Sequence, residues 1–374
     1  MSTRATGAAS TSVAACGDCL RRSWLLAALS GHIERASRRR RDLSNLFALS
    51  DEALIAALGG RMAPRLRAAH GAFEPAAARN RAACAGQGAI CRHDERFPPS
   101  VAETPDGPAA LYVAGDLERL LALVAEPAVA VVGARRASAY ALEVARALGR
   151  DLSAAGITVV SGMALGVDSA AHAGALAGGA RTIAVLAGSA GVAYPRSKRR
   201  LHEQLVGAGA VVSEMPPGSV ALRWSFPARN RVIAALARAT VVVEAADRSG
   251  SLITADFARE LGRDVGAVPG LVTSGRAQGT NALLFDGAHF VRDAGDVLDL
   301  LFGAGARERT ARRDGSELDA RLRRVLAAVE DGGGPLSALA TTPEDARAAM
   351  AALAELELLG YVRRGPAGSY ARVA

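Results

Sequence analysis

The stretch AVAVVGARRASAY, residues 128–140, joins a short apolar run to a glycine and then to a segment that can begin a helix. Strands that alternate with helices require crossover connections and form a mostly parallel sheet. Strands that are apolar almost throughout are covered on both faces. We therefore predict a doubly wound α/β domain. An apolar run followed by a segment of different character recurs along the chain, and these further runs lie at 157–162, 181–188, 210–214, 240–246, 264–270 and 289–291.

The segments on either side of this domain differ from it in character. Before it, helical spacing of leucines predicts a small all-helical domain, in which Ser50 caps a helix. After it, three helical patterns and a hairpin are typical of a winged helix. The expected order is a disordered N-terminus, the helical domain, an extended connection with several prolines, the α/β domain, a linker and the winged helix, at residues 1–18, 19–92, 93–127, 128–302, 303–316 and 317–374.

The composition sets limits on the partners of the chain. Its 374 residues carry a formal net charge of +8, and aromatic residues make up 4%. A basic balance is compatible with a polyanionic partner, although an arginine-rich composition gives the same charge without a ligand. No apolar run is long enough to span a bilayer and no signal peptide is recognisable, so we expect no membrane partner and a cytoplasmic location.

Small and basic residues follow the predicted strands. In open α/β sheets ligands bind beyond the carboxyl ends of the strands. Glycine lets the backbone approach a ligand, a helix start offers free N–H groups, and guanidinium groups match phosphate. One such loop is more simply an ordinary turn, but five in succession predict a rim of phosphate sites. These loops contain Gly133, Arg135, Ser138, Ser161, Gly162, Lys198, Arg199, Arg200, Arg229, Asn230, Arg231, Ser249, Gly250, Ser251 and Asn281.

Two of these candidates stand in the segment FPARNRVIAALA, residues 226–237, where Arg229 and Arg231 begin an apolar helix. Their partner could be a nucleotide, a nucleic acid or only a neighbouring carboxylate. Aromatic residues that could stack on bases are few near this rim, and each is equally compatible with a core position; they are Tyr140, Tyr194, Trp224 and Phe226.

No catalytic or metal-binding set stands out from the sequence. Asp168 and Glu244 could form an acid–base pair, but nothing in their spacing requires it. Asp168 is more simply a helix cap, and His172 a packed side chain. Cys16 and Cys19 form a C-x-x-C, but the other two cysteines, Cys84 and Cys91, have an unusual spacing, so a four-cysteine zinc site is not favoured. We predict no catalytic residue, no cofactor and no metal.

The motifs taken together resemble the DNA-processing protein A (DprA, or Smf) family. They include GARRASAY, SGMALGVDSAAHAGAL, FPARNRVIAALA and VVVEAADRSGSLITADFARELGRDV. The resemblance implies an extended Rossmann-like domain that binds single-stranded DNA, a homodimer, and help in loading the RecA recombinase during natural transformation, without nucleotide hydrolysis. Many members have Gly-Ser-Arg in the first motif, whereas this chain has Gly133-Ala134-Arg135 and lacks that hydroxyl.

Two other functions compete with single-strand binding. A Rossmann-like enzyme acting on a small nucleotide or other phosphorylated ligand would need a catalytic carboxylate, for which Glu244 is the candidate. A regulator that reads duplex DNA would use the winged helix. Its expected recognition helix, residues 342–358, is largely acidic, which disfavours contact with a DNA groove.

Overall fold

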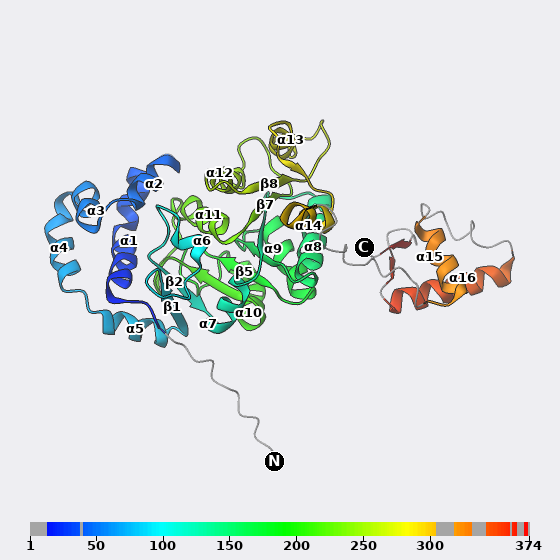
Figure 1. The fold of residues 1–374 in the computed structure, drawn as a ribbon, viewed down its shortest axis with the longest axis horizontal. Coiled ribbons are helices and arrows are strands. Elements are labelled where there is room, and N and C mark those ends of the chain that lie inside the picture. The colour runs from blue at the N-terminus through cyan, green and yellow to red at the C-terminus, as the bar shows by residue number, and fades with distance from the viewer. Residues whose placement is uncertain are drawn as a thin grey trace, which may run out of the picture. The chain divides into compact units, whose positions relative to one another are not determined.

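The computed structural model describes residues 13–37, 40–303, 318–330, 342–359, 361–364 and 370–372. The chain divides into two compact units, Met1–Ala306 and Arg307–Ala374 (Figure 1). Each unit has a hydrophobic core of its own. No helix in the described part of the chain is long and apolar enough to cross a membrane.

A nine-stranded sheet forms the centre of the first unit. Its strands are β1 (Gln87–Cys91), β2 (Ala110–Ala114), β3 (Ala128–Val132), β4 (Thr158–Ser161), β5 (Thr182–Val185), β6 (Ala210–Ser213), β7 (Ala239–Val242), β8 (Asp264–Ala267) and β9 (His289–Phe290). They lie in the order β1-β2-β6-β5-β4-β3-β7-β8-β9. Strands β3 to β9 are parallel, and β1 and β2 extend one edge in antiparallel pairing. The seven predicted strands are therefore present, and the mostly parallel α/β sheet is confirmed.

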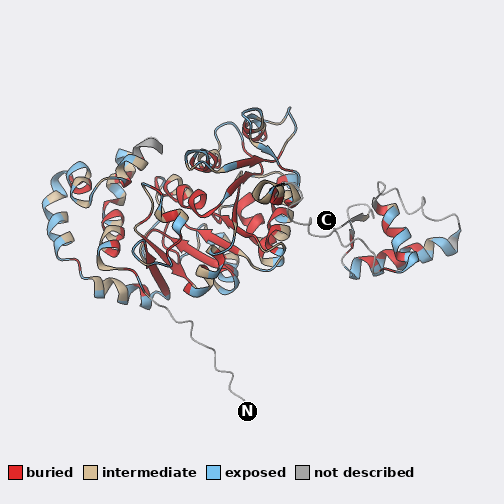
Figure 2. Ribbon diagram, viewed as in Figure 1, coloured by how far each residue is buried: buried red, intermediate tan, exposed pale blue. Residues whose placement is uncertain are grey.

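Helices cover both faces of this sheet, because alternate residues of a strand point to opposite sides. In β3, Val129 and Val131 share a core with α8 (Ala139–Ala154), α9 (Val167–Ala177) and α14 (Ala294–Phe302). Ala130 and Val132 share the opposite core with α6 (Pro99–Ala102), α7 (Leu117–Val124), α11 (Ser225–Leu236), α12 (Leu252–Glu260) and α13 (Gln278–Phe285). A smaller core includes part of α10 (Arg199–Ala208), which follows the short 3-10 helix η2 (Arg196–Lys198). Figure 2 shows the central strands as a buried layer, whereas the edge strand β9 is exposed.

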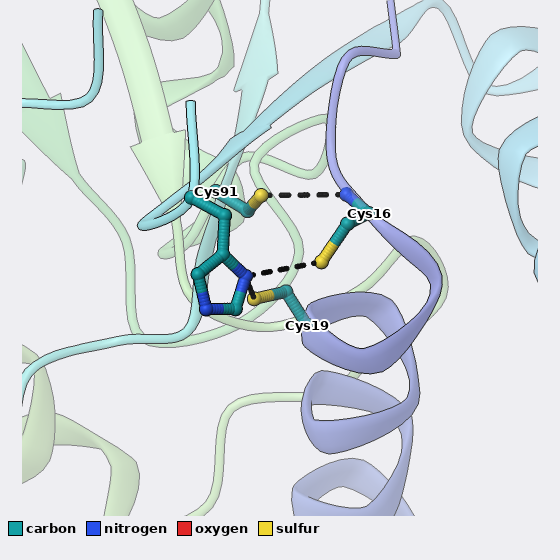
Figure 3. A group of neighbouring side chains, drawn as sticks. Cys16, Cys19 and Cys91 are labelled. Carbon is teal, nitrogen blue, oxygen red and sulfur yellow. Dashed lines mark hydrogen bonds between the residues drawn. The ribbon is translucent and has the colours of Figure 1, made fainter. Parts of the chain in front are cut away.

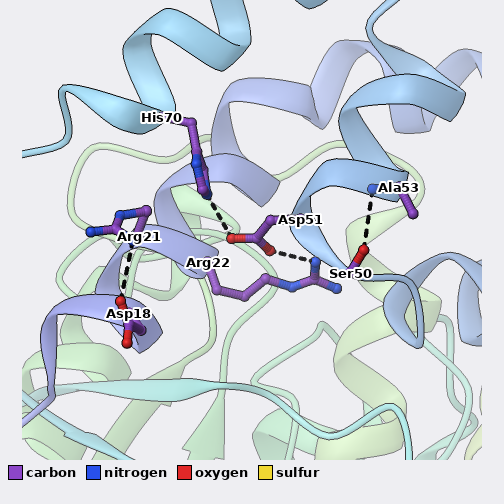
Figure 4. A network of polar contacts seen from close by, with 7 residues as sticks. All are labelled: Asp18, Arg21, Arg22, Ser50, Asp51, Ala53 and His70. Atoms are coloured by element: carbon purple, nitrogen blue, oxygen red, sulfur yellow. Dashed lines mark hydrogen bonds and ion pairs between the residues drawn. The ribbon is translucent and has the colours of Figure 1, made fainter.

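The N-terminal helices gather beside the β1 and β2 edge of the sheet (Figure 1). They are α1 (Gly17–Ala36), α2 (Arg40–Phe47), α3 (Asp51–Leu58), η1 (Gly60–Met62), α4 (Ala63–Gly71) and α5 (Pro75–Cys84). The Oγ of Ser50 accepts a hydrogen bond from the N–H of Ala53, which confirms the predicted cap. Asp51 ties three helices together, since its carboxylate lies 2.7 Å from both Arg22 Nη1 and His70 Nε2 (Figure 4).

The structure departs from the predicted segment boundaries at the N-terminal side of the sheet. Strand β1 falls within residues 19–92, expected to be all helical, and β2 falls within residues 93–127, expected to be an extended connection. The prolines that suggested a connection lie in the turns and in α6, so they do not interrupt β2. Within the expected disordered segment 1–18, helix α1 already begins at Gly17 and Val13 bridges to β1. Residues 1–12 lie outside the described part.

The second unit contains two described helices and a hairpin. These elements are α15 (Ala320–Glu330), α16 (Pro343–Leu358), β10 (Val362–Arg364) and β11 (Tyr370–Arg372). Leu322 and Leu326 of α15 share a core with Leu353 and Leu356 of α16. The predicted helix around Leu336 and Leu339 falls outside the described residues, as does nearly all of the predicted linker. The winged helix therefore stays a prediction.

Three glycines let helices α8 and α9 pack with their backbones in direct contact. A Cβ built on Gly149 of α8 would lie 2.1 Å from the carbonyl oxygen of Ala171, and one on Gly174 of α9 would lie 2.0 Å from that of Arg146. Gly178, which ends α9, makes the same approach to Arg150. Any larger side chain would push the two helices apart. This contact fixes the two helices whose first turns flank the loops after β3 and β4.

We expect Gly174→Ala to lower the free energy of unfolding by about 1–3 kcal/mol, because the added methyl group must displace backbone atoms. Chemical denaturation of the full chain followed by circular dichroism measures this change. Gly31→Ala is the matched control, since Gly31 is also helical but a methyl group added there would meet no atom within 4 Å. That control should stabilise the chain by about 0.5–1 kcal/mol. Equal effects of the two substitutions would contradict the close-packing argument.

Candidate functional site

The order of the strands reverses at β3, which has β4 on one side and β7 on the other. In a doubly wound sheet the loops that leave such neighbouring strands run in opposite directions and leave a crevice at the carboxyl ends. A cavity of about 920 Å³ lies there. Its walls come from the loops after β3, β4 and β7 and from the first turns of α11 and α12. The cavity therefore stands where the sequence predicted a ligand.

Arginine dominates the ionisable groups of the cavity. Asp168 is the single carboxylate among the described residues that line it. Five of the arginines are exposed, and the sixth, Arg229, is buried. The six are Arg135, Arg136, Arg223, Arg229, Arg248 and Arg276. This excess of guanidinium groups gives the cavity a positive potential suited to anions.

About half of the predicted site residues line this cavity. They are Gly133, Arg135, Arg229, Asn230, Ser249, Gly250 and Ser251. Gly162 lines an adjoining hollow that shares Arg135 and Arg229 with the first. A Cβ on Gly250 would meet no atom within 4 Å, so the backbone of this loop is open to a ligand.

Arg229 is held from three sides at the base of the cavity. Its Nη1 donates hydrogen bonds to the carbonyl oxygens of Gly162 at 2.6 Å and Val185 at 2.5 Å, just after β4 and at the end of β5. Its Nε donates to Oδ1 of Asn230 at 3.2 Å. Burial lowers the pKa of Arg229 to about 10, and the charge of Asp168 opposes that shift. The guanidinium group is therefore charged at neutral pH.

Asp168 shapes the loop after β4 instead of capping its helix. Its Oδ2 accepts hydrogen bonds from the N–H groups of Gly162 at 3.2 Å and Ala164 at 3.3 Å, while the cap position is Gly166. Burial raises the pKa of Asp168, and Arg229 and these amides oppose the rise. Gly162 has no room for a side chain, because a Cβ would lie 2.0 Å from Nη1 of Arg229.

Arg231 does not reach the cavity. Its Nη2 lies 2.7 Å and 2.6 Å from the two carboxylate oxygens of Glu214, and its guanidinium carbon lies 4.4 Å from the ring centre of Phe47 in α2. Both members of the ion pair are buried. Of the partners considered for this arginine, a neighbouring carboxylate is the one found, and the side chain joins α11 to β6 and the N-terminal helices.

Three further predicted residues are occupied by contacts within the protein. The N–H of Ser138 donates to Oε2 of Glu244 at 2.7 Å, so a carboxylate of the chain already fills the first turn of α8. The hydroxyl of Ser161 is buried and donates to the carbonyl oxygen of Val131. The side-chain amide of Asn281 pairs with the backbone N–H and C=O of Gly270.

The basic run that opens α10 lies outside the cavity lining. Arg199 is exposed and pairs with Glu203 at 2.8 Å, one turn along the helix. Arg200 is exposed and Lys198 is half-buried. The run follows shortly after Tyr194 in the sequence, and Tyr194 does line the cavity. These cations are therefore close in the sequence to the cavity lining without being part of it.

Two aromatic residues named from the sequence do line the cavity. Tyr194 and Phe226 lie with their ring centres 5.3 Å apart, and the guanidinium carbon of Arg135 lies 5.0 Å from the centre of Phe226. Trp224 is instead buried against Phe47 in the core beneath the N-terminal helices. Tyr140 is exposed but does not line the cavity.

Four of the lining arginines were not predicted. Arg136 and Arg248 stand next to predicted loop residues in the sequence, and this position could have identified them as cavity residues. Arg223 stands just before the segment 226–237, and Arg276 lies in the loop just before Asn281, but neither was named as a candidate. They reach the cavity because the segment before α11 and the segment before α13 fold over the same end of the sheet.

The fold and this site define a doubly wound α/β protein with an arginine-lined cavity at the switch point of its sheet. The chain belongs to the DNA recombination-mediator protein A family, whose model matches residues 88–302. The family predicted from the motifs is thus confirmed. The matched range begins in β1, which agrees with the extension of the sheet by β1 and β2.

Several relatives support this assignment. Protein Smf of Escherichia coli is 36% identical over 287 residues, which cover 75% of this chain and 75% of the relative. DNA processing protein DprA of Streptococcus pneumoniae is 40% identical over 205 residues, covering 55% of this chain and 71% of the relative. The crystal structure of DprA from Streptococcus pneumoniae has a TM-score of 0.60 at 32% identity and covers 75% of this chain and 95% of that one.

We expect Arg231→Met to destabilise the fold by about 3–5 kcal/mol, because it leaves the carboxylate of Glu214 buried without a partner. The double substitution Arg231→Met with Glu214→Leu should recover most of that loss, since apolar residues can replace a buried ion pair. Chemical denaturation of the single and double variants gives the coupling energy. Additive effects would show that the two groups do not depend on each other.

Stability should also fall in mild acid through His172 of α9. This side chain is fully buried, and its Nδ1 lies 2.7 Å from Oγ1 of Thr182. Burial, with the charge of Arg229, lowers its pKa from 6.5 to about 3, which agrees with the packed role predicted for it. Between these two pH values the unfolded chain binds a proton that the folded chain does not, so stability is full above pH 6.5 and is lost as pH falls toward 3.

The expected loss from this one residue is about 1.4 kcal/mol per pH unit within that window. Denaturation curves measured above and within the window should therefore show a shallower pH dependence for His172→Leu than for the wild type. Parallel pH profiles of the two proteins would exclude His172 as a source of acid sensitivity.

Proposed function

We propose that this chain binds single-stranded DNA through its phosphates at the arginine-lined cavity. The observation that carries the proposal is the set of six arginines with one carboxylate around a cavity at the switch point of the sheet. A positive groove that follows the backbone, with few aromatic platforms, gives affinity for single strands without sequence preference.

Two features of the cavity suit a strand better than an isolated anion. Phe226 and Tyr194 form an aromatic pair beside Arg135, where a base could stack next to a bound phosphate. The basic residues Lys198, Arg199 and Arg200 continue the positive charge along the chain beyond Tyr194. We propose that a strand leaves the cavity past this helix start.

The proposed biological role follows from the family. We propose that the chain protects incoming single strands and helps to load the RecA recombinase on them, as a homodimer in the cytoplasm and without catalysis. Glu244, the carboxylate suspected for an enzyme, is engaged by the N–H of Ser138 and does not line the cavity. This engagement favours binding over bond breaking.

A second candidate, an enzyme acting on a small nucleotide, rests on one observation. The cavity volume of about 920 Å³ lies within the range of small-molecule sites, and the buried carboxylate of Asp168 faces it. Such a pocket would saturate with a single nucleotide. A DNA track would instead gain affinity as the strand becomes longer.

Fluorescence anisotropy with labelled poly-dT of increasing length, against matched duplex and at several salt concentrations, tests these functions. We expect Arg135→Ala and Arg248→Ala each to weaken binding by at least roughly tenfold, because a hydrogen bond to a charged group contributes about 1.5–3 kcal/mol. Each substitution should also reduce the salt dependence of log K by about 0.7.

Arg146→Ala provides the matched control, since Arg146 is exposed on α8 and does not line the cavity. It should leave the affinity unchanged. Binding that saturates at one nucleotide would favour the enzyme. Binding that prefers duplex, or that Arg146→Ala weakens as strongly as Arg135→Ala, would contradict the proposed track.

A further inference from the structure

Three cysteines and one histidine meet at the junction between the N-terminal helices and the sheet. Cys16 and Cys19 stand at the start of α1, and Cys91 ends β1 (Figure 3). His93 follows two residues after Cys91. The three Sγ atoms and a ring nitrogen of His93 all lie within 4.8 Å of one another. The cluster joins segments that are 74 residues apart in the sequence.

The distances inside the cluster match those of a tetrahedral zinc site. Nδ1 of His93 lies 3.3 Å from Sγ of Cys16 and 3.5 Å from Sγ of Cys19. With Zn–S near 2.3 Å and Zn–N near 2.0 Å, tetrahedral sulfur and nitrogen ligands are about 3.5 Å apart. These two distances are thus already near the spacing that one zinc ion would impose, and every other pair of ligand atoms lies within 4.8 Å.

The surroundings of the cluster also suit a metal. The backbone N–H of Cys16 donates to Sγ of Cys91 at 3.3 Å, as a donor to a metal-bound thiolate would. Cys19 and Cys91 are buried, Cys16 is half-buried and His93 is exposed. Soft thiolates with one imidazole select zinc over the hard cations magnesium and calcium.

We propose a structural zinc site whose four ligands are Cys16, Cys19, Cys91 and His93. Four protein ligands complete the tetrahedron and leave no position for a substrate, so the site serves folding and not catalysis. The ion fastens the start of α1 to the end of β1. It reinforces the backbone hydrogen bonds that Ala14 and Ala15 donate to the carbonyl oxygen of Ala89.

A zinc site was not favoured from the sequence because the four cysteines were considered as its ligands, and their spacing is unusual. Cys84, the cysteine nearest to Cys91 in the sequence, is exposed near the end of α5 and takes no part in the cluster. The fourth ligand is His93. The motif is therefore a C-x-x-C at a helix start with a C-x-H at a strand end, and only the pairing of α1 with the sheet edge brings the two together.

Metal analysis of the purified full chain tests the proposal. After exchange into metal-free reducing buffer, inductively coupled plasma mass spectrometry should find about one zinc per chain, because a closed structural site retains its ion. Chain stripped of zinc and given cobalt should show thiolate-to-cobalt charge transfer and the visible bands of tetrahedral cobalt. These readouts need no variant, so they do not depend on whether a variant folds.

Variants then assign the ligands. Cys19→Ser and His93→Ala should each lower zinc affinity by at least about 100-fold, beyond the effect of losing an outer hydrogen-bond partner. Cys84→Ser is the matched control and should keep full zinc content. A chelator should speed alkylation of Cys19 in the wild type and leave the alkylation rate of Cys84 unchanged.

Three results would overturn the proposal. The first is a folded wild-type chain that holds no zinc and gives no cobalt–thiolate absorption. The second is a disulfide between Cys16 and Cys19 in a chain that binds no metal, which would make the C-x-x-C a redox pair. The third is a loss of zinc in Cys84→Ser as large as that in Cys19→Ser.

Discussion

A buried guanidinium group holds the candidate site together. Arg229 reaches from α11 to carbonyl oxygens beyond β4 and at the end of β5, so it ties the helix layer to two neighbouring strands. A buried charge is costly unless its donors are satisfied, and here two carbonyls, an amide and the nearby Asp168 supply the compensation. Gly162 must remain a glycine for this geometry, because any side chain would occupy the space of the arginine. The position of the loop after β4, and with it the base of the cavity, depends on this contact.

The charges near the site divide between structure and ligand. Arg231 and Glu214 neutralise each other under the N-terminal helices, and Glu244 occupies the first turn of α8. Arg135, Arg136, Arg223, Arg248 and Arg276 remain exposed around the cavity. Two arginines only two residues apart in one helix thus have different roles: Arg229 lines the cavity, whereas Arg231 stabilises the contact with α2. The difference arises because residues two apart on a helix point in different directions.

The sheet also depends on the segment that precedes the doubly wound core. Strands β1 and β2 extend it in antiparallel pairing, and the N-terminal helices pack beside that edge through α1 and α5. The edge strand β1 is therefore covered along part of its length by Val13, Ala14 and Ala15, which protects backbone groups that would otherwise be open to another chain. The four candidate zinc ligands stand at this same junction, where a bound zinc ion would hold the N-terminal segment against β1.

Sequence alone determined the strands β3 to β9, the loops that carry the site and the family, because those features rest on local apolar runs, glycines and motifs that keep their order along the chain. Gly133, Arg135, Arg229, Asn230 and the Ser249–Ser251 loop, which the sequence indicated as phosphate-binding, line the cavity, and their binding role stays a prediction. Only the tertiary structure decided which arginines face the cavity, that Glu244 fills a helix start, that β1 and β2 join the sheet, and that His93 meets Cys16 and Cys19. Each of these features depends on contacts between segments far apart in the chain. The direction and burial of each side chain decide which partner it meets, and the spacing of residues along the sequence does not specify either property.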